Sequence, residues 1–253
     1  MDAGGYFVFG EGTPRSIMFI GDAPGEIDAY KERAFAGPSG ELVRGIMAKL
    51  NCSTYYTTTL VSCRSCTPSL AKETGLPIIK KINGVPTPMY RDSSPLPTEI
   101  GACRARLLEE IYLVDPVVIV TLGVSAAETL MGHPVTITRD RGRPEHIQIP
   151  GKTCKPSLTE TRQVWGRKKG GVVTYPTLPN MLSYLVLPTT ASSFVINKRA
   201  DLTERGPFNN FLNDLKLAVR IYEKYLIEVM RVEPGFTHDA DFTEMEALYA
   251  EEG

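Results

Sequence analysis

Three carboxylates, Asp22, Glu26 and Asp28, crowd one loop near the start of the chain. The loop opens with Gly21-Asp22-Ala23-Pro24-Gly25. Glycine and the fixed φ of proline favour a tight turn that lies close to a ligand. Carboxylates at such a turn can orient a water molecule and stabilise positive charge that develops during a reaction. The same three residues could also be solvated charges of a surface loop.

Two other groups of side chains could bind a ligand. The first is a basic segment with Trp165 in its midst, made of Arg162, Arg167, Lys168 and Lys169. Such a patch can neutralise DNA phosphates even though the net charge of the chain is −1; a solvated loop would have the same composition. The second group is the five cysteines, which in a chain without a recognisable export signal indicate thiols or metal ligands before disulfides.

The elements that must position these residues alternate along the chain. Apolar or β-branched runs predict strands over 15–20, 55–61, 117–122 and 172–175, and a strand pair within 136–149. Apolar residues at helical spacing predict helices over 39–50, 98–114 and 209–232. This alternation is typical of an α/β domain with a largely parallel central sheet. Because ligands bind such sheets at the carboxyl ends of strands, the chemistry is expected after Ile20, Val61, Leu122 and Tyr175.

The domain organisation predicted from composition is simple. Residues 1–232 are expected to form one domain with two polar insertions, 66–96 and 150–170, and an acidic mobile tail follows at 233–253. No apolar run reaches the roughly 18 residues that a membrane span needs. The first residues lack a basic region followed by an apolar core, so we expect a cytoplasmic protein without a secretory signal.

Five sequence blocks, in order, carry a resemblance to a known family. Residues 21–43 read GDAPGEIDAYKERAFAGPSGELV, which resembles the first motif of the family-4 uracil-DNA glycosylases. The other four blocks are TTTLVSCR (57–64), SPLPTEIGACRARL (94–107), PVVIVTLGVSAAETLMG (116–132) and VTITRDRG (135–142). The resemblance covers roughly residues 7–230, and five motifs in family order are far more specific than one.

The resemblance implies a fold and an activity. The fold would be the three-layer α/β sandwich of uracil-DNA glycosylases, and the activity would be cleavage of the N-glycosidic bond of a base flipped out of DNA. Asp22, with Glu26 and Asp28, would position the attacking water and offset positive charge on the sugar. The loop from Gly21 to Gly25 would form the floor of the base pocket, and Phe35 would stack on the base. Phe35 could instead belong to the ordinary core.

Two pocket positions depart from the family pattern. Thr59 stands where the family has an asparagine that reads the edge of uracil, and a hydroxyl cannot replace a planar amide that both donates and accepts. Leu178 is placed at the family histidine that stabilises the leaving base, with Pro179 and Asn180 completing the outline of that DNA-contacting loop. Bidentate recognition of uracil is therefore not expected.

A third departure concerns metal. Family 4 usually holds an iron–sulfur cluster through four cysteines, and Cys63 and Cys103 occupy two of those positions. Cys66 is an additional neighbour, and either Cys52 or Cys154 could supply a fourth thiolate for iron–sulfur or zinc. Reduced cysteines without metal are the alternative. The chemistry itself would require no cofactor.

Two functions remain open from the sequence. The first is a monomeric DNA glycosylase that acts on uracil, or on a modified pyrimidine for which Thr59 and Leu178 make room, as in viral DNA or in defence against it. The second is a catalytically inactive DNA-binding or replication-associated protein, consistent with the missing histidine. We favour the enzyme because several carboxylates remain beside the glycine turn.

Overall fold

The computed structural model describes residues 7–82, 84–150, 161–163, 172–174, 181–199 and 206–228. Its centre is a six-stranded sheet in the order β1-β3-β2-β8-β12-β9. The strands are β1 (Glu11–Gly12), β3 (Tyr55–Thr59), β2 (Ile17–Gly21), β8 (Val118–Leu122), β12 (Met181–Thr189) and β9 (Glu145–Pro150). The four inner strands are parallel, and β1 and β9 close the edges in antiparallel pairings. The predicted α/β class with a largely parallel sheet is confirmed.

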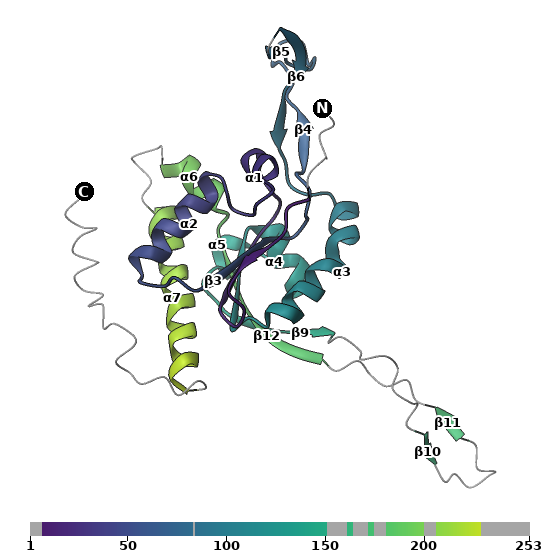
Figure 1. The fold of residues 1–253 in the computed structure, drawn as a ribbon, viewed down its shortest axis with the longest axis vertical. Helices are drawn as coiled ribbons and strands as arrows, with labels where there is room; N and C mark the ends of the chain where they lie inside the picture. The colour runs from purple at the N-terminus through teal and green to yellow at the C-terminus, as the bar shows by residue number, and fades with distance from the viewer. Residues whose placement is uncertain are drawn as a thin grey trace.

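Helices cover both faces of this sheet (Figure 1). One face packs against α2 (Pro38–Lys49), α6 (Ser192–Arg199) and α7 (Gly206–Glu228). The other packs against α3 (Pro97–Val114) and α4 (Val124–Met131). Because successive side chains of a strand point to opposite faces, strands covered on both sides are mostly apolar. This explains why the apolar runs of the sequence predicted β2 and β8 correctly, although β8 also contains the buried Thr121.

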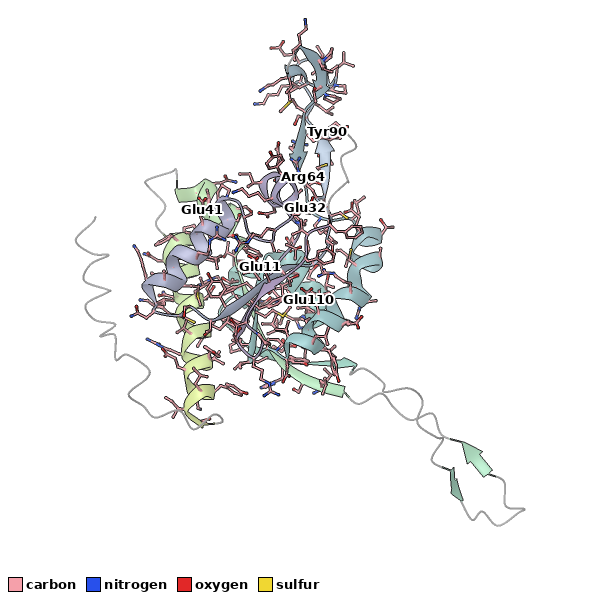
Figure 2. All side chains as sticks on the ribbon, viewed as in Figure 1. Glu11, Glu32, Glu41, Arg64, Tyr90 and Glu110 are labelled. Carbon is pink, nitrogen blue, oxygen red and sulfur yellow. The ribbon has the colours of Figure 1, made fainter. Side chains whose placement is uncertain are left out.

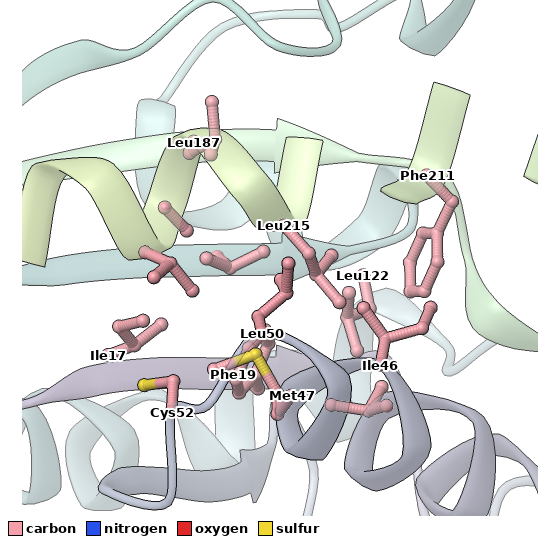
Figure 3. Close-up of a cluster of buried hydrophobic side chains, with 14 of the residues drawn as sticks. Ile17, Phe19, Ile46, Met47, Leu50, Cys52, Leu122, Leu187, Phe211 and Leu215 are labelled. Carbon is pink, nitrogen blue, oxygen red and sulfur yellow. The ribbon is translucent and has the colours of Figure 1, made fainter. Parts of the chain in front are cut away.

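The two faces of β2 show how the core is divided. Ile17 and Phe19 belong to the cluster shared with α2 and α7, whereas Met18 and Ile20 belong to the cluster shared with α3. All four side chains are fully buried. Figure 3 shows the first cluster, in which Phe19 lies beside Met47 of α2 and Leu215 comes from α7. These two cores hold β2 firmly, and they fix the position of the loop that follows it.

Two strand predictions are wrong. The residues 136–149 do not form a strand pair; they hold a short helix, α5 (Ile137–Asp140), and β9, whose partner is β12. The run at 172–175 does not join the central sheet, because β11 (Val172–Thr174) pairs only with β10 (Thr161–Gln163). The last parallel strand is β12, which pairs with β8 from Val186 to Thr189.

The first predicted insertion contains regular structure. Residues 66–92, which we call the arm, have a stem made of β4 (Cys66–Pro68) and β7 (Tyr90–Asp92). A hairpin of β5 (Ile79–Ile82) and β6 (Val85–Pro88) lies beyond the stem. The arm projects from the body on the side where α1 (Glu26–Lys31) lies (Figure 1). None of the described helices is long and apolar enough to cross a membrane.

Candidate active site

A cavity of about 840 Å³ lies at the carboxyl ends of β2, β3 and β8. This is the edge of a parallel sheet where ligands bind in α/β proteins. The cavity brings together all the described residues that the sequence predicted for catalysis and base binding: Gly21, Asp22, Ala23, Pro24, Gly25, Glu26, Asp28, Phe35 and Thr59. Their individual roles remain predictions, but they are within reach of one bound molecule.

Asp22 lies at the start of this loop and is directed toward the N-terminus of α4. Its Oδ1 accepts a hydrogen bond of 2.8 Å from the amide of Ala126. Gly123 makes room for the carboxylate, since a Cβ at that position would lie 2.6 Å from Oδ2 of Asp22. Burial raises the pKa of Asp22, and hydrogen bonds from the Ala126 amide and the Ser125 hydroxyl lower it by less. The result is a carboxylate that accepts a proton more readily than a solvated aspartate.

Asp28 has a different environment, although it lies only six residues further along the loop. Its Oδ2 accepts a hydrogen bond of 3.0 Å from the amide of Gly25, and its Oδ1 accepts one of 2.9 Å from the amide of Gly37. The residue is 8% exposed. Because each of its oxygens accepts a hydrogen bond from a backbone amide, Asp28 joins two segments of the cavity wall.

Glu26 lies exposed at the rim, in a group of charges that was not expected from the sequence. Its carboxylate is 3.2 Å from the guanidinium of Arg64, which also donates a 2.7 Å hydrogen bond to Asp92 at the base of the arm. Asp92, Ser93 and Ser94 line the cavity. Arg64 therefore connects the carboxylate loop to the arm.

Phe35 lines the cavity and is also a member of the buried core cluster shared with α2 and α7, with 5% of the residue exposed. It is held there in a strained conformation. Its φ is +56°, which is unusual for a residue with a bulky side chain. A Cβ at Gly21 would lie 3.3 Å from the ring, so the ring packs closely on the strand end. The guanidinium of Arg44 holds the carbonyl of Phe35 at 2.6 Å. Gly40 is equally necessary, because a Cβ there would lie 1.7 Å from the same carbonyl oxygen. Strain of this kind is typical of functional sites.

Thr59 has no free hydrogen-bond donor for a bound base, although its residue type provides one. The hydroxyl donates a 2.8 Å hydrogen bond to the carbonyl of Val61, and the residue is 2% exposed. Its only proton is thus used within the protein, and the donor that an asparagine amide would supply is lost. Arg106 of α3 fixes this strand end by donating hydrogen bonds to the carbonyls of Thr59 and Leu60, at 2.6 and 3.1 Å.

Sequence reasoning missed Arg106, although a signal was present. Arg106 and Glu110 are four residues apart on a predicted helix and form an ion pair. Glu110 in turn accepts hydrogen bonds of 3.0 Å from the hydroxyls of Tyr56 and Thr58 on β3. These contacts attach the end of β3 to α3 and keep Thr59 in place.

The loop after the last parallel strand was also placed incorrectly. Because β12 ends at Thr189, the cavity is reached by Ala191 of the following loop and by Ser192 and Ser193 at the start of α6. The predicted positions Leu178, Pro179 and Asn180 lie outside the described residues. Their placement depended on a final strand at 172–175, which is not part of the central sheet. The described residues that line the cavity include no histidine, lysine or arginine.

The cysteines do not form a metal site within the described part of the chain. No group of three or more His, Cys, Asp or Glu side chains there could hold a metal ion. Cys63, Cys66 and Cys103 are half-buried thiols. Burial raises the pKa of Cys63, as do the neighbouring Cys103 and Glu99, so Cys63 and Cys103 are close to each other. Cys154, offered as a fourth ligand, lies outside the described residues.

The predicted basic patch is described only in part. Arg162 lies on β10, but its side chain, like Arg167, Lys168 and Lys169, falls outside the described residues. These four remain a predicted DNA contact.

Comparison with known proteins gives a family and several relatives of similar sequence. The family model of the uracil DNA glycosylase superfamily matches residues 8–216. A type-4 uracil-DNA glycosylase of Thermotoga maritima is 30% identical over 141 residues, which cover 54% of this chain and 61% of that protein. The type-4 enzyme of Archaeoglobus fulgidus is 27% identical over 156 residues, 59% of this chain and 66% of that protein.

A third relative matches the most residues of the three. The type-4 enzyme of Sulfurisphaera tokodaii is 28% identical over 176 residues, 66% of this chain and 61% of that protein. The chain thus spans less than two thirds of the length of these curated relatives. The family model nevertheless covers most of the chain, including every strand of the sheet and the whole described cavity. The chain belongs to the uracil DNA glycosylase superfamily.

Proposed function

We propose that this protein is a DNA glycosylase that hydrolyses the N-glycosidic bond of an extruded pyrimidine and leaves an abasic site. One observation carries the proposal: Asp22 presents a carboxylate at the cavity, held by the amide of Ala126 and without a cation among the described lining residues. A carboxylate in this state can orient water and stabilise an oxocarbenium-like sugar. The relatives named type-4 uracil-DNA glycosylases support the same reaction class.

The residues around Asp22 would bind the base and hold the walls of the cavity in place. The extruded base would lie on the ring of Phe35, whose conformation is fixed by Gly40 and Arg44. Asp28 would be a positioning residue, because its oxygens hold the amides of Gly25 and Gly37. Glu26 would remain at the rim, paired with Arg64. The reaction would require no cofactor.

The choice of base follows from what the cavity lacks. Thr59 offers no donor to the edge of uracil, and no cationic side chain among the described lining residues would stabilise a departing base anion. The hydroxyls of Ser192 and Ser193 are neutral and would help less. We therefore expect a modified pyrimidine with a more stable anion to be cleaved faster than uracil. DNA with unusual bases, in viruses or in defence against them, is the setting that fits such a substrate.

A panel of duplexes tests the proposal. Each duplex carries one uracil, 5-hydroxymethyluracil or 5-formyluracil, and alkali converts abasic sites to strand breaks. The two modified bases have similar size, but only the formyl group strongly withdraws electrons, so the expected order is formyl, then hydroxymethyl, then uracil. Asp22→Asn protein is the matched control. If folded wild-type protein cleaves none of the three, and none of a wider set of modified pyrimidines, the proposal fails.

A second function is favoured by one observation, the lack of a described histidine, lysine or arginine in the cavity wall. A protein that has lost the means to stabilise a leaving base could retain the fold as an inactive DNA-binding or replication-associated subunit. Equal duplex binding by wild-type and Asp22→Asn protein, with no cleavage by either, would favour this reading. Cleavage that depends on Asp22 would exclude it.

A further inference from the structure

The arm is the largest feature that the cavity chemistry does not use. Its hairpin has the register Ile79↔Pro88 to Ile82↔Val85, and Gly84 in the turn has a φ of +80°. Backbone hydrogen bonds join hairpin to stem, from the Ser69 amide to the Met89 carbonyl (2.8 Å) and from the Met89 amide to the Ile78 carbonyl (2.9 Å). The arm is therefore an ordered two-stranded ribbon.

The base of the arm is fixed at the mouth of the cavity. Asp92, the last residue of the stem, lines the cavity and accepts the 2.7 Å hydrogen bond from Arg64. Figure 2 shows Arg64 at the foot of the arm and Tyr90 above it. A duplex that delivers a nucleotide to the cavity must pass close to this point, so the ribbon beyond it would lie alongside the DNA.

The hairpin exposes an unusual combination of side chains. Ile79, Ile82 and Val85 are 60%, 51% and 62% exposed, and no element of the described chain covers them. Lys80 and Lys81 lie between the isoleucines, are exposed, and form no ion pair within the described part of the chain. Cross-strand pairing puts Lys80, Ile82 and Val85 on one face of the ribbon and Ile79 and Lys81 on the other. Each face thus carries a cation and an apolar side chain.

This combination fits DNA better than a protein strand. Proteins that enter DNA grooves with β-ribbons use lysines on phosphates and apolar side chains against sugars and base edges. Strand addition by a protein partner needs backbone donors along a free edge. On the β6 edge of the hairpin, Pro86 and Pro88 have no amide proton to donate. On the β5 edge, the charges of Lys80 and Lys81 discourage pairing with another strand.

We propose that the arm is a DNA-reading ribbon that enters a groove beside the extruded nucleotide. Lys80 and Lys81 contact backbone phosphates, and the tip pair of Ile82 and Val85 packs against sugars and base edges. The inference rests on the proposed function only in requiring a DNA duplex at the cavity, because groove binding needs no cleavage.

The lysines and the apolar side chains of the ribbon should affect DNA binding differently. Binding of an undamaged duplex is measured by fluorescence anisotropy at several salt concentrations. Lys80→Ala/Lys81→Ala should weaken binding about tenfold and reduce the slope of log affinity against log salt by about 2, since each lost phosphate contact removes about 0.9. Ile82→Ser/Val85→Ser should weaken binding and leave the slope unchanged. Lys224→Ala is the control, on α7, whose C-terminal end points away from the arm in Figure 1.

A deletion controls for folding and for other partners. Replacing residues 70–88 by Gly-Gly keeps the stem and the Arg64–Asp92 contact, so thermal unfolding should be unchanged while duplex affinity falls. Wild-type affinity and salt slope in all three arm variants would overturn the inference. Concentration-dependent dimers in sedimentation velocity that only the tip variant abolishes, with DNA affinity unchanged, would also overturn it and indicate a second copy instead.

The binding assay separates this inference from the proposed function. Weakened binding in the arm variants, with no cleavage by the wild-type protein, would support the ribbon and contradict the glycosylase. Cleavage by the wild-type protein, with normal binding by all arm variants, would support the glycosylase and contradict the ribbon.

Discussion

Two aspartates near the same end of the sheet, one half-buried and one buried, have opposite surroundings. Asp214 of α7 is 3% exposed and is held at both oxygens by Arg141, at 3.0 and 2.8 Å, with a further hydrogen bond from the hydroxyl of Thr189. Asp22 is held by the amide of Ala126, and no cation lies among the described residues that line its cavity. The two sites share a residue type, but Asp22 is half-buried and Asp214 is buried, and they differ in whether a cation neutralises the charge.

The difference indicates which aspartate is structural and which is available for chemistry. Burial raises the pKa of both carboxyl groups; at Asp214 the hydrogen bond from Thr189 and the charge of Arg141 oppose that effect. A guanidinium that occupies both oxygens leaves no room for water, so Asp214 can only join α7 to the turn before β9. Asp22 keeps the capacity to accept a proton. The comparison can be tested by removing each charge in turn.

The largest effect is expected for Asp22→Asn. Loss of the carboxylate should reduce the single-turnover cleavage rate by about 10²–10⁴-fold, the usual contribution of a general base. Thermal unfolding should not occur at a lower temperature, because an asparagine oxygen can still accept the hydrogen bond from the Ala126 amide and the half-buried charge is gone. A variant that cleaves at the wild-type rate would break the contrast with Asp214.

The pH dependence of stability and of cleavage, compared between the wild-type protein and Asp22→Asn, gives a second test of the role of Asp22. A folded-state pKa raised above the unfolded value means that Asp22 favours folding when protonated, and that this stability is lost as the pH rises through the folded pKa. Cleavage should show the opposite trend, falling as the pH drops through the same pKa. Asp22→Asn should remove both pH dependences.

The next largest effect is expected for Arg141→Ala, on stability. Removing the guanidinium leaves Asp214 buried without its cation, which should reduce the free energy of unfolding by about 3–5 kcal/mol in urea titrations. Cleavage per folded molecule should stay near the wild-type rate. Thr189→Val is the milder control and should cost about 1 kcal/mol. A large catalytic defect in folded Arg141→Ala protein would contradict the assignment of Asp214 as structural.

Gly40→Ala should affect stability and activity together. The added methyl group would collide with the carbonyl of Phe35, so we expect a loss of about 1–3 kcal/mol and slower cleavage as the aromatic ring moves. Gly45→Ala on the same helix is the matched control, because nothing lies within 4 Å of its Cβ position. That change should stabilise the protein by about 0.5–1 kcal/mol. Equal effects at both glycines would show that Phe35 does not depend on Gly40.

Thr59→Val should have the smallest effect on function. The carbonyl of Val61 loses its donor, which should cost about 1 kcal/mol of unfolding free energy. The order of preference among the three bases in the cleavage panel should not change, because the hydroxyl proton is already used within the protein. A reordering of those bases would show that Thr59 contacts the substrate directly.

Local patterns were sufficient to predict β2, β3, β8 and the carboxylate loop of the cavity. Val118–Leu122 is fully buried because helices cover both its faces, and Thr121 is the polar member of an otherwise apolar run. The glycine turn after Ile20 is recognisable in the residues themselves. β12 was missed because Ser183 and Pro188 interrupt its apolar pattern, and proline is unusual in an inner strand. The run at 172–175 looked more like a strand, so Ala191, Ser192 and Ser193 were not expected at the cavity.

Contacts between distant residues could not be predicted in the same way. Arg141 and Asp214 are 73 positions apart, and Arg64 meets Asp92 only through the pairing of β4 with β7. The occupation of Asp28 by two backbone amides depends on the turn at Gly37. In each case the hydrogen-bonding partner is set by tertiary structure. From residue type alone, Asp22, Glu26 and Asp28 were therefore predicted to have the same role.

The stem of the arm has a consequence for how this scaffold can change. Ser69 and Met89 are hydrogen-bonded neighbours, so the chain leaves and re-enters the fold at almost one point. The number of residues between them has little effect on the stability of the sheet, since doubling the length of a loop adds only about 0.6 kcal/mol to the cost of closing it. Residues 70–88 are therefore an exchangeable cassette. A different insertion can replace residues 70–88, in evolution or by design, while the base cavity stays intact.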